Sequence, residues 1–100
     1  MPINNKKHST AINQTTGAVI RSLRKKKNLS GYDFGCLTGL SQQQISRYEQ
    51  GYSNLTLNLL IEMLLALDVT LDEFLYQVNM QCGFTDGKDI LFLFNKNNDS

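Results

Sequence analysis

The segment from residue 41 to residue 50 carries side chains that can form directional hydrogen bonds to the edges of nucleic-acid bases. The amide of Gln42 can bond adenine at N6 and N7, and the guanidinium of Arg47 can bond guanine at O6 and N7. In a helix, at ~100° per residue, these side chains lie away from Ile45 and Tyr48. The members of this polar face are Gln42, Gln43, Ser46, Arg47 and Gln50. The alternative interpretation is an ordinary solvated helix face.

The residue types that most enzyme sites need are scarce or isolated in this chain. Its one histidine stands at position 8, and its two cysteines, Cys36 and Cys82, lie far apart in the sequence. No stretch has the spacing of metal ligands, of a nucleophile with its base, or of a glycine loop that cradles phosphate. We therefore predict no catalytic residue, no metal, no cofactor and no small-molecule ligand. The cysteines are interpreted as free thiols in a reducing compartment.

The polar segment needs a tight turn and a preceding helix to hold it. Gly35 has no side chain, so two helices can approach closely there, and Gly39 can adopt the positive φ that the turn between them requires. Ser41 is a good N-cap for the second helix, Ile45 packs that helix against the first, and Gly51 ends it. This spacing favours a helix-turn-helix. It makes contact with DNA a much better interpretation of the polar face than an ordinary solvated helix face.

Hydrophobic periodicity predicts five helices in all. The first covers about 11–26 and the second follows Ser30, its N-cap, with Asp33 three residues later as in a capping box. The fourth covers 57–67 and the fifth starts at about residue 71, with Thr56 and Thr70 as N-caps of the last two. The fourth helix is apolar over most of its girth and should be the centre of the core. The side chains expected to face the core are Ile12, Thr16, Val19, Ile20, Leu23, Phe34, Leu37, Leu57, Leu60, Ile61, Leu64, Leu65, Leu67, Leu71, Phe74, Leu75 and Val78.

The chain length of 100 residues predicts one domain with tails. Residues 1–10 are polar and lack periodicity, which predicts a disordered arm. Residues 11–78 form the all-α domain, and residues 79–100 form a C-terminal extension. So small a core makes a dimer partner a reasonable expectation.

The C-terminal extension contains a short continuous apolar run, whose length and flanks suggest a strand. This strand can pair with its copy in a second subunit, or its side chains can cover a partner's helix. The alternative is a segment folded back over its own core. We favour dimerisation, through Ile90, Leu91, Phe92, Leu93 and Phe94.

The net charge of +1 hides a strong asymmetry between the two halves of the chain. Residues 1–53 hold eight Lys and Arg against two Asp and Glu, a net charge of +6, whereas residues 54–100 hold two against seven, a net charge of −5. A polyanion is therefore attracted to the half that contains the helix-turn-helix. The C-terminal end of the first helix carries a basic cluster, which either complements the helix dipole or faces phosphate, and both roles are compatible. Its members are Arg21, Arg24, Lys25, Lys26 and Lys27, of which Arg21, Lys25 and Lys26 are the predicted phosphate contacts.

The loop after the polar helix has the chemistry of a phosphate contact. Its backbone N–H groups, together with Ser53 and Asn54, can bind a phosphate oxygen without any charge, and Tyr52 stands in the same loop. The alternative is a plain connector between two helices.

The pattern from Thr16 to Val78 resembles the Cro/CI, or XRE, family of helix-turn-helix DNA-binding domains. The resemblance is carried by GAVIRSLRKKKNLS, by the Gly39-Leu40-Ser41 turn, by ISRYEQG and by LIEMLLALDVTLDEFL. More narrowly, SQQQISRYEQG is similar to the MrpJ-like regulators encoded in fimbrial operons of enterobacteria. That likeness implies a link between adhesin expression and repression of flagellar motility.

The resemblance also implies roles for individual residues. Gln42, Gln43 and Arg47 fall on base-reading positions, with Gln44 and Ser46 on supporting ones. Ser41 and the loop 51–54 fall on phosphate-contact positions, and Arg24 and Glu49 fall on a pair that often forms a salt bridge between the first and third helices. The sequence departs from the family pattern at Gly31, where a polar residue is usual, and at Gly35, where alanine is usual.

Together these features predict a homodimeric transcriptional regulator that binds double-stranded promoter or operator DNA. No signal peptide and no run of 18 apolar residues is present, so we expect a cytoplasmic, nucleoid-associated protein without membrane contact. The alternative function is a protein-interaction module, similar to an antitoxin or an adaptor, built on the same fold.

Overall fold

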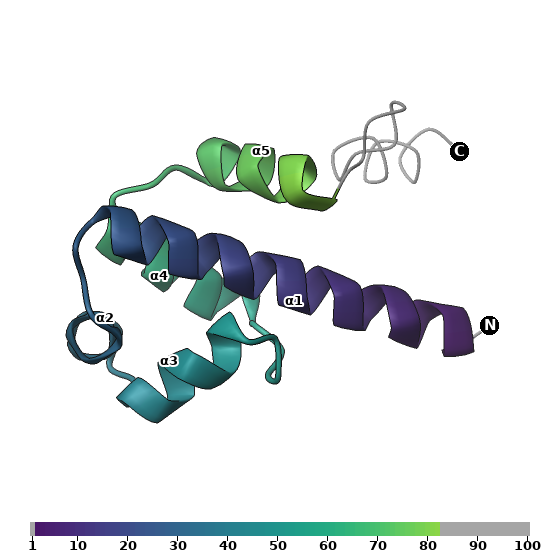
Figure 1. Ribbon diagram of the computed structural model, residues 1–100, viewed down its shortest axis with the longest axis horizontal. Coiled ribbons are helices and arrows are strands. Elements are labelled where there is room, and N and C mark those ends of the chain that lie inside the picture. Colours follow the sequence, from purple (N-terminus) through teal and green to yellow (C-terminus); the bar gives the residue numbers. More distant parts are fainter. Residues whose placement is uncertain (1, 83–100) are drawn as a thin grey trace.

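The computed structural model describes residues 2–82, which form five α-helices (Figure 1). Their bounds are α1 (Pro2–Lys26), α2 (Gly31–Thr38), α3 (Gln42–Glu49), α4 (Leu57–Leu67) and α5 (Leu71–Cys82). The described residues contain no β-strand, so the predicted all-α fold of five helices is confirmed.

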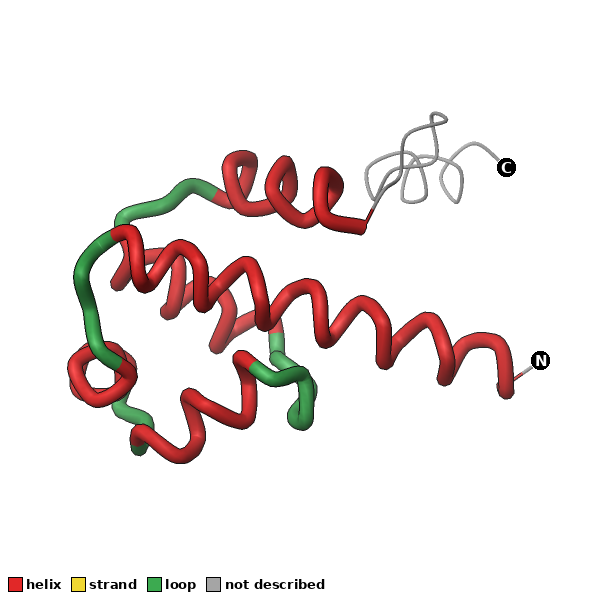
Figure 2. Tube along the Cα trace, in the orientation of Figure 1, coloured by secondary structure: helices red, strands yellow, loops and turns green. Residues whose placement is uncertain are grey.

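Helix α1 is the longest element, with 25 residues, and the other helices are arranged around its C-terminal half. Figure 2 shows α2 and α3 on one side of α1 and α5 on the other, with α4 crossing behind it. Helix α1 packs against α3 and α5, whereas α2 packs against α3 and α4. This arrangement holds α3 between α1 and α2 and leaves its remaining surface free.

The start of α1 differs from the sequence prediction. The helix begins at Pro2 rather than at about Ala11, so helix replaces the predicted disordered arm from Pro2 onward. Proline is favourable at the first helical position because its missing N–H would have no partner there, and residues 3–16 contain no glycine or proline. The polar residues gave no hydrophobic stripe, which is the signal on which the prediction relied.

The core lies where α1, α2, α3, α4 and α5 meet. Ten apolar side chains are buried there, and every helix supplies at least one of them. They are Val19, Ile20, Leu23, Phe34, Ile45, Met63, Leu64, Leu67, Phe74 and Val78. The predicted inward face is thus confirmed for most of α1 and for one side of each later helix.

Several apolar side chains that were expected in the core face outward. Leu37 of α2 is 58% exposed, and Leu57 and Leu65 of α4 are 68% and 75% exposed. Ile12, Ile61 and Leu71 are exposed as well. The prediction that these side chains face the core is wrong, because a helix buries only the part of its surface that meets its neighbours. Helix α4 therefore contributes one face to the core and presents a second apolar face to solvent.

Hydroxyl side chains begin three of the helices where the sequence predicted caps. Ser30 and Asp33 form a capping box at α2, with the Asp33 N–H donating to Ser30 Oγ over 2.9 Å. Thr56 Oγ1 accepts from the Leu59 N–H at α4, and Thr70 Oγ1 accepts from the Glu73 N–H at α5, each over 3.1 Å. These bonds satisfy backbone donors that the helices themselves leave unpaired.

The strand and dimer contact predicted for Ile90–Phe94 lie outside the described residues. Within residues 2–82, no helix has both the length and the apolar character needed to cross a lipid bilayer.

Candidate nucleic-acid interface

The turn between α2 and α3 is built around two glycines. Gly39 has φ +77°, and its neighbour Leu40 donates its N–H to the Gly35 carbonyl over 2.9 Å. A Cβ on Gly35 would collide with the carbonyl oxygen of Leu40 and would lie 3.3 Å from the Leu40 carbonyl carbon. The positive φ predicted for Gly39 is confirmed, whereas the close neighbour of Gly35 is the turn itself and not the second helix, as had been predicted.

The N-terminus of α3 is closed by a reciprocal pair of hydrogen bonds. Ser41 Oγ accepts from the Gln44 N–H over 3.0 Å, and Gln44 Oε1 accepts from the Ser41 N–H over 2.9 Å. Ser41 is therefore the predicted N-cap. The amide oxygen of Gln44 is engaged in fixing the first turn, which suits the supporting role expected of it.

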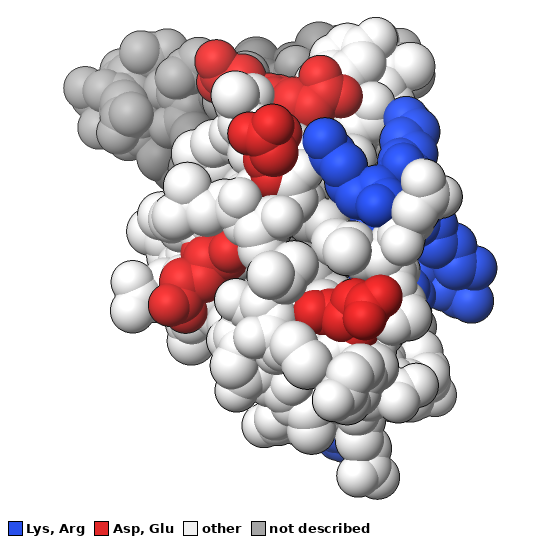
Figure 3. All heavy atoms as spheres, turned by 90° about the vertical axis from the view of Figure 1, so that its left-hand side faces the viewer, with Lys and Arg blue, Asp and Glu red and all other residues white. Residues whose placement is uncertain are grey.

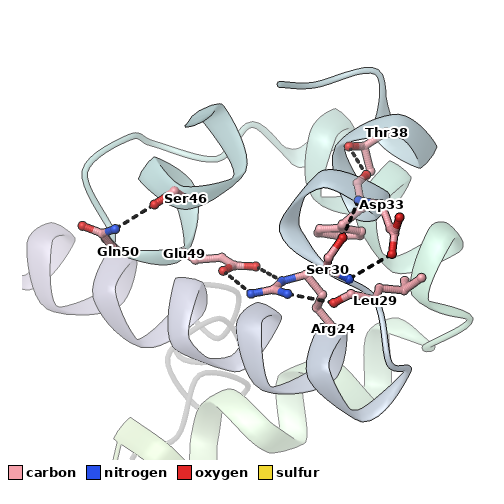
Figure 4. A network of polar contacts seen from close by, with 9 residues as sticks. Arg24, Leu29, Ser30, Asp33, Thr38, Ser46, Glu49 and Gln50 are labelled. Atoms are coloured by element: carbon pink, nitrogen blue, oxygen red, sulfur yellow. Dashed lines mark hydrogen bonds and ion pairs between the residues drawn. The ribbon is translucent and has the colours of Figure 1, made fainter. Parts of the chain in front are cut away.

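The inner side of α3 is fixed to α1 by a buried ion pair (Figure 4). Arg24 donates from Nε to Glu49 Oε2 over 2.7 Å and from Nη2 to Glu49 Oε1 over 3.0 Å. Its third bond runs from Nη1 to the Leu29 carbonyl over 2.8 Å. The hydrogen bond with Glu49 is the main reason why the pKa of Arg24 is raised above its usual value. The expected link between the first and third helices is confirmed.

Gly17 lets α1 and α3 come together and was missed by the sequence prediction. It is buried, and a Cβ there would lie 2.6 Å from the carbonyl oxygen of Glu49. Glycine inside a helix costs ~0.5–1 kcal/mol relative to alanine, so its presence at this position calls for a packing reason. A glycine inside a predicted helix, in spite of this cost, was the one sequence feature that could have revealed the contact.

The loop after α3 rests against α1. Gly51 has φ +82°, and a Cβ there would lie 2.8 Å from the Cα of Gln14. The side chain of Asn13 donates to the amide oxygen of Asn54, which adds a second link between this loop and α1. The predicted phosphate-contact residues Tyr52, Ser53 and Asn54 therefore stand on a loop that α1 supports.

Arg47 and Tyr52 are joined by both backbone and side chain. The Tyr52 N–H donates to the Arg47 carbonyl over 2.9 Å, and Arg47 Cζ lies 5.9 Å from the centre of the Tyr52 ring. No feature of the sequence predicted this cation–π contact. It orients the guanidinium that was predicted to read a base.

The outward side of α3 remains polar and accessible. Gln42, Gln43 and Arg47 are exposed, while Ser46 is half-buried and accepts a hydrogen bond from Gln50 Nε2 over 2.8 Å (Figure 4). The structure thus gathers the predicted base-reading residues on one helix. Gln50 joins them through its bond to Ser46.

Arg21 lies beside this polar face, and Lys25 lies next to Arg21. A cavity of about 340 Å³ is lined by Arg21 of α1, Gly31 of α2 and residues of α3 that include Gln42. Arg21 and Lys25 share the lining of a second cavity of about 330 Å³. Lys26 is rotated by ~140° around α1 from Arg21, so the structure does not place it with them. Figure 3 shows most of the Lys and Arg on this face gathered toward one edge of the molecule.

Comparisons with known proteins agree with this architecture. A protein-family model described as helix-turn-helix matches residues 20–74. The solved structure of the restriction-modification controller protein C.AhdI from Aeromonas hydrophila is 30% identical, with a TM-score of 0.61, over 64% of this chain and 97% of that one. The clp gene regulator ClgR from C. glutamicum is 22% identical, with a TM-score of 0.65, over 67% of this chain and 86% of that one. No curated protein sequence matches the chain.

Proposed function

Because the chain belongs to the helix-turn-helix family of the Cro/CI (XRE) type, we propose that it reads operator DNA by inserting α3 into the major groove. Membership of this family makes the chain a DNA-binding transcriptional regulator and not an enzyme. The observation that carries the proposal is the two-sided character of α3. Its inner side is held by Ile45 and by the Arg24–Glu49 pair, while its outer side is polar and free.

The base contacts in this proposal come from the exposed side chains of α3. Gln42 and Gln43 suit adenine and Arg47 suits guanine, because their paired hydrogen-bonding groups match those bases in the major groove. Ser46 accepts a hydrogen bond from Gln50, and Gln44 is part of the capping box. Both residues therefore support α3.

The phosphate contacts come from the elements that flank α3. Ser41 stands at its N-terminus and the loop Tyr52–Asn54 follows its C-terminus, so the two mark both ends of the helix. Arg21 and Lys25 extend this surface along α1, and Lys26 adds to the positive field from a different side of that helix.

Two copies of the chain acting together account best for operator recognition. A two-fold dimer places two recognition helices about one helical turn of DNA apart, ~34 Å. The apolar run Ile90–Phe94 supplies the contact between the copies in this proposal.

The proposed target genes are those for fimbriae and motility. This part of the proposal is supported by the likeness of SQQQISRYEQG to the MrpJ-like regulators.

Binding to two promoters across a series of salt concentrations tests the proposal. The probes are the promoter of the protein's own operon, a flagellar master-operon promoter and random DNA of equal length. We expect a steep loss of affinity with salt on all three, and a preference of ~10³ or more for the promoters. Equal affinity for random DNA would contradict sequence reading, and no binding at low salt would favour a protein-interaction module.

A further inference from the structure

An apolar groove lies on the surface between the end of α4 and the start of α5. It has a volume of about 320 Å³ and is lined mainly by apolar side chains, among them Ile61, Leu65 and Leu71. Leu65 and Leu71 are exposed, although both are large and apolar. None of the lining residues takes part in the two cavities beside α3, so the groove is separate from the proposed DNA-binding surface.

The groove continues along α4 as a regular stripe. Leu57, Ile61 and Leu65 recur at intervals of four residues and are all exposed, so they share one face of the helix. Single exposed leucines are ordinary, whereas a continuous apolar surface of this kind marks a contact with another group.

The groove has one charged lining residue, and that residue is acidic. It is Asp68, at the end of α4. No Lys or Arg is among its lining residues. The occupant that fits such a groove is an apolar segment with positive charge at its ends.

The chain itself contains a segment with this chemistry. Ile90–Phe94 is a run of five apolar residues, with Lys88 two positions before it and Lys96 two positions after it. Asp89 is the only acidic residue within 88–96. Both charge and hydrophobicity therefore complement the groove.

The linker before this segment is longer than α5. Helix α5 has 12 residues and is ~18 Å long. The residues 83–89 that separate Cys82 from the apolar run span up to ~23 Å when extended. The run can therefore reach a groove on its own chain as well as one on a second copy, and the dimeric assembly proposed above favours the second copy.

We propose that the groove binds Ile90–Phe94 of a second copy of this chain, and that the exchange is reciprocal in a two-fold dimer. The inference rests on the dimeric regulator proposed above and identifies the surface that receives the segment. Burial of the two phenylalanines alone removes roughly 150–250 Å² of surface each from water. When both segments and an equal area on the two grooves are counted, the dimer buries ~1,200–2,000 Å² of surface in total, which is the size of a stable interface.

Disulfide trapping in the full-length chain tests this assignment. Leu65→Cys is combined with Phe92→Cys in a background of Cys36→Ser and Cys82→Ser, which removes the natural thiols. The matched control combines Tyr76→Cys with Phe92→Cys, because Tyr76 is also exposed but lies ~140° around α5 from Leu71. We expect the first pair to form a covalent dimer at least ~10-fold faster than the control, with circular dichroism unchanged. A disulfide within one monomer, or equal rates for both pairs, would overturn the proposal.

A second variant tests the same contact without cysteines. Leu65→Asp places a charge in the groove at an already exposed position, so the helical fold should persist while the dimer dissociation constant rises at least ~10-fold in sedimentation equilibrium. An unchanged dissociation constant would overturn the assignment. DNA binding by the reduced protein is measured separately. A dimer that prefers the promoter but forms no disulfide between Leu65→Cys and Phe92→Cys would refute only the assignment of the groove. A dimer that forms this disulfide but shows no preference for the promoter would refute only the proposed operator reading.

Discussion

Arg24 links the proposed recognition helix to the rest of the molecule through three hydrogen bonds. Two join its guanidinium to both oxygens of Glu49, and the third reaches the Leu29 carbonyl in the connection between α1 and α2. The side chains are only 11% and 6% exposed, so water cannot replace a lost partner easily. Glu49 is therefore a structural residue, although it stands on the same helix as the proposed base-reading residues.

The change Glu49→Ala should lower the free energy of unfolding by about 3–5 kcal/mol, because it leaves the Arg24 charge buried without its partner. Urea denaturation followed by circular dichroism measures this effect. Glu62→Ala on the exposed side of α4 is the control and should change stability by less than ~0.5 kcal/mol. Similar losses for both variants would show that the ion pair has no special role.

Tyr52 acts on the same surface in a different way, because its ring contacts the guanidinium of Arg47. We expect Tyr52→Leu to reduce the preference for promoter over scrambled DNA about two- to fivefold, since an exposed cation–π contact contributes ~0.5–1 kcal/mol. Tyr52→Phe keeps the ring and should keep the preference, as measured by fluorescence anisotropy. Equal weakening of binding to both DNAs by Tyr52→Phe would report the phosphate contact proposed for this loop, whereas an unchanged preference in Tyr52→Leu would show that the ring does not position Arg47.

At the scale of the elements, local chemistry predicted most of the interface. Ser30, Ser41 and Thr56 each cap a helix where their side chains indicated, and Gly39 has the positive φ expected from the turn. These features depend on neighbours within four residues, so the sequence displays them directly.

Features that depend on distant segments were not predictable in the same way. The contact of Gly17 with α3 joins residues about thirty positions apart, and nothing in either helix alone requires it. The exposure of Leu37 and Leu65 follows from which helix face finds a neighbour. An apolar pattern shows which residues can be buried, but only the packing of the helices decides which of them are buried.

The packing of α1 on α3 yields a stability prediction. Gly17→Ala forces a Cβ against the backbone of Glu49 and should destabilise the fold by about 1–3 kcal/mol, despite the better helix propensity of alanine. Gly31→Ala is the matched control, because its Cβ would meet only Gln42 Cγ, at 3.4 Å. Thermal denaturation should show a lower melting temperature for the first variant alone. Equal melting temperatures would mean that the two helices can separate at little cost.

For the whole molecule, the dominant feature is the separation of charge. The half of the chain that contains α1, α2 and α3 carries +6, and the other half carries −5. This separation turns the α3 side toward a polyanion during approach and turns the acidic α4–α5 side away from it. The two proposed interfaces, one for DNA and one for a second copy, therefore differ in sign as well as in place.

The salt dependence of promoter binding should distinguish the basic residues of α1. Arg21→Ala and Lys25→Ala should each reduce the slope of log K against log salt by ~0.9, the value for one lost phosphate contact. Lys26→Ala removes the same charge from a different side of α1 and should change the slope less. Identical changes for all three variants would indicate a diffuse field effect instead of defined phosphate contacts.

The central claim is that the exposed side chains of α3 read bases, and one comparison tests it most directly. The variant Gln42→Ala/Gln43→Ala/Arg47→Ala keeps Ile45, Glu49 and both caps, so its fold should be intact by circular dichroism. Its affinity for the promoter and for scrambled DNA is measured at one fixed salt concentration beside that of the unchanged protein. We predict that promoter affinity falls to the level of scrambled DNA, while affinity for scrambled DNA changes by less than about tenfold. A variant that keeps its full preference for the promoter would contradict base reading by α3.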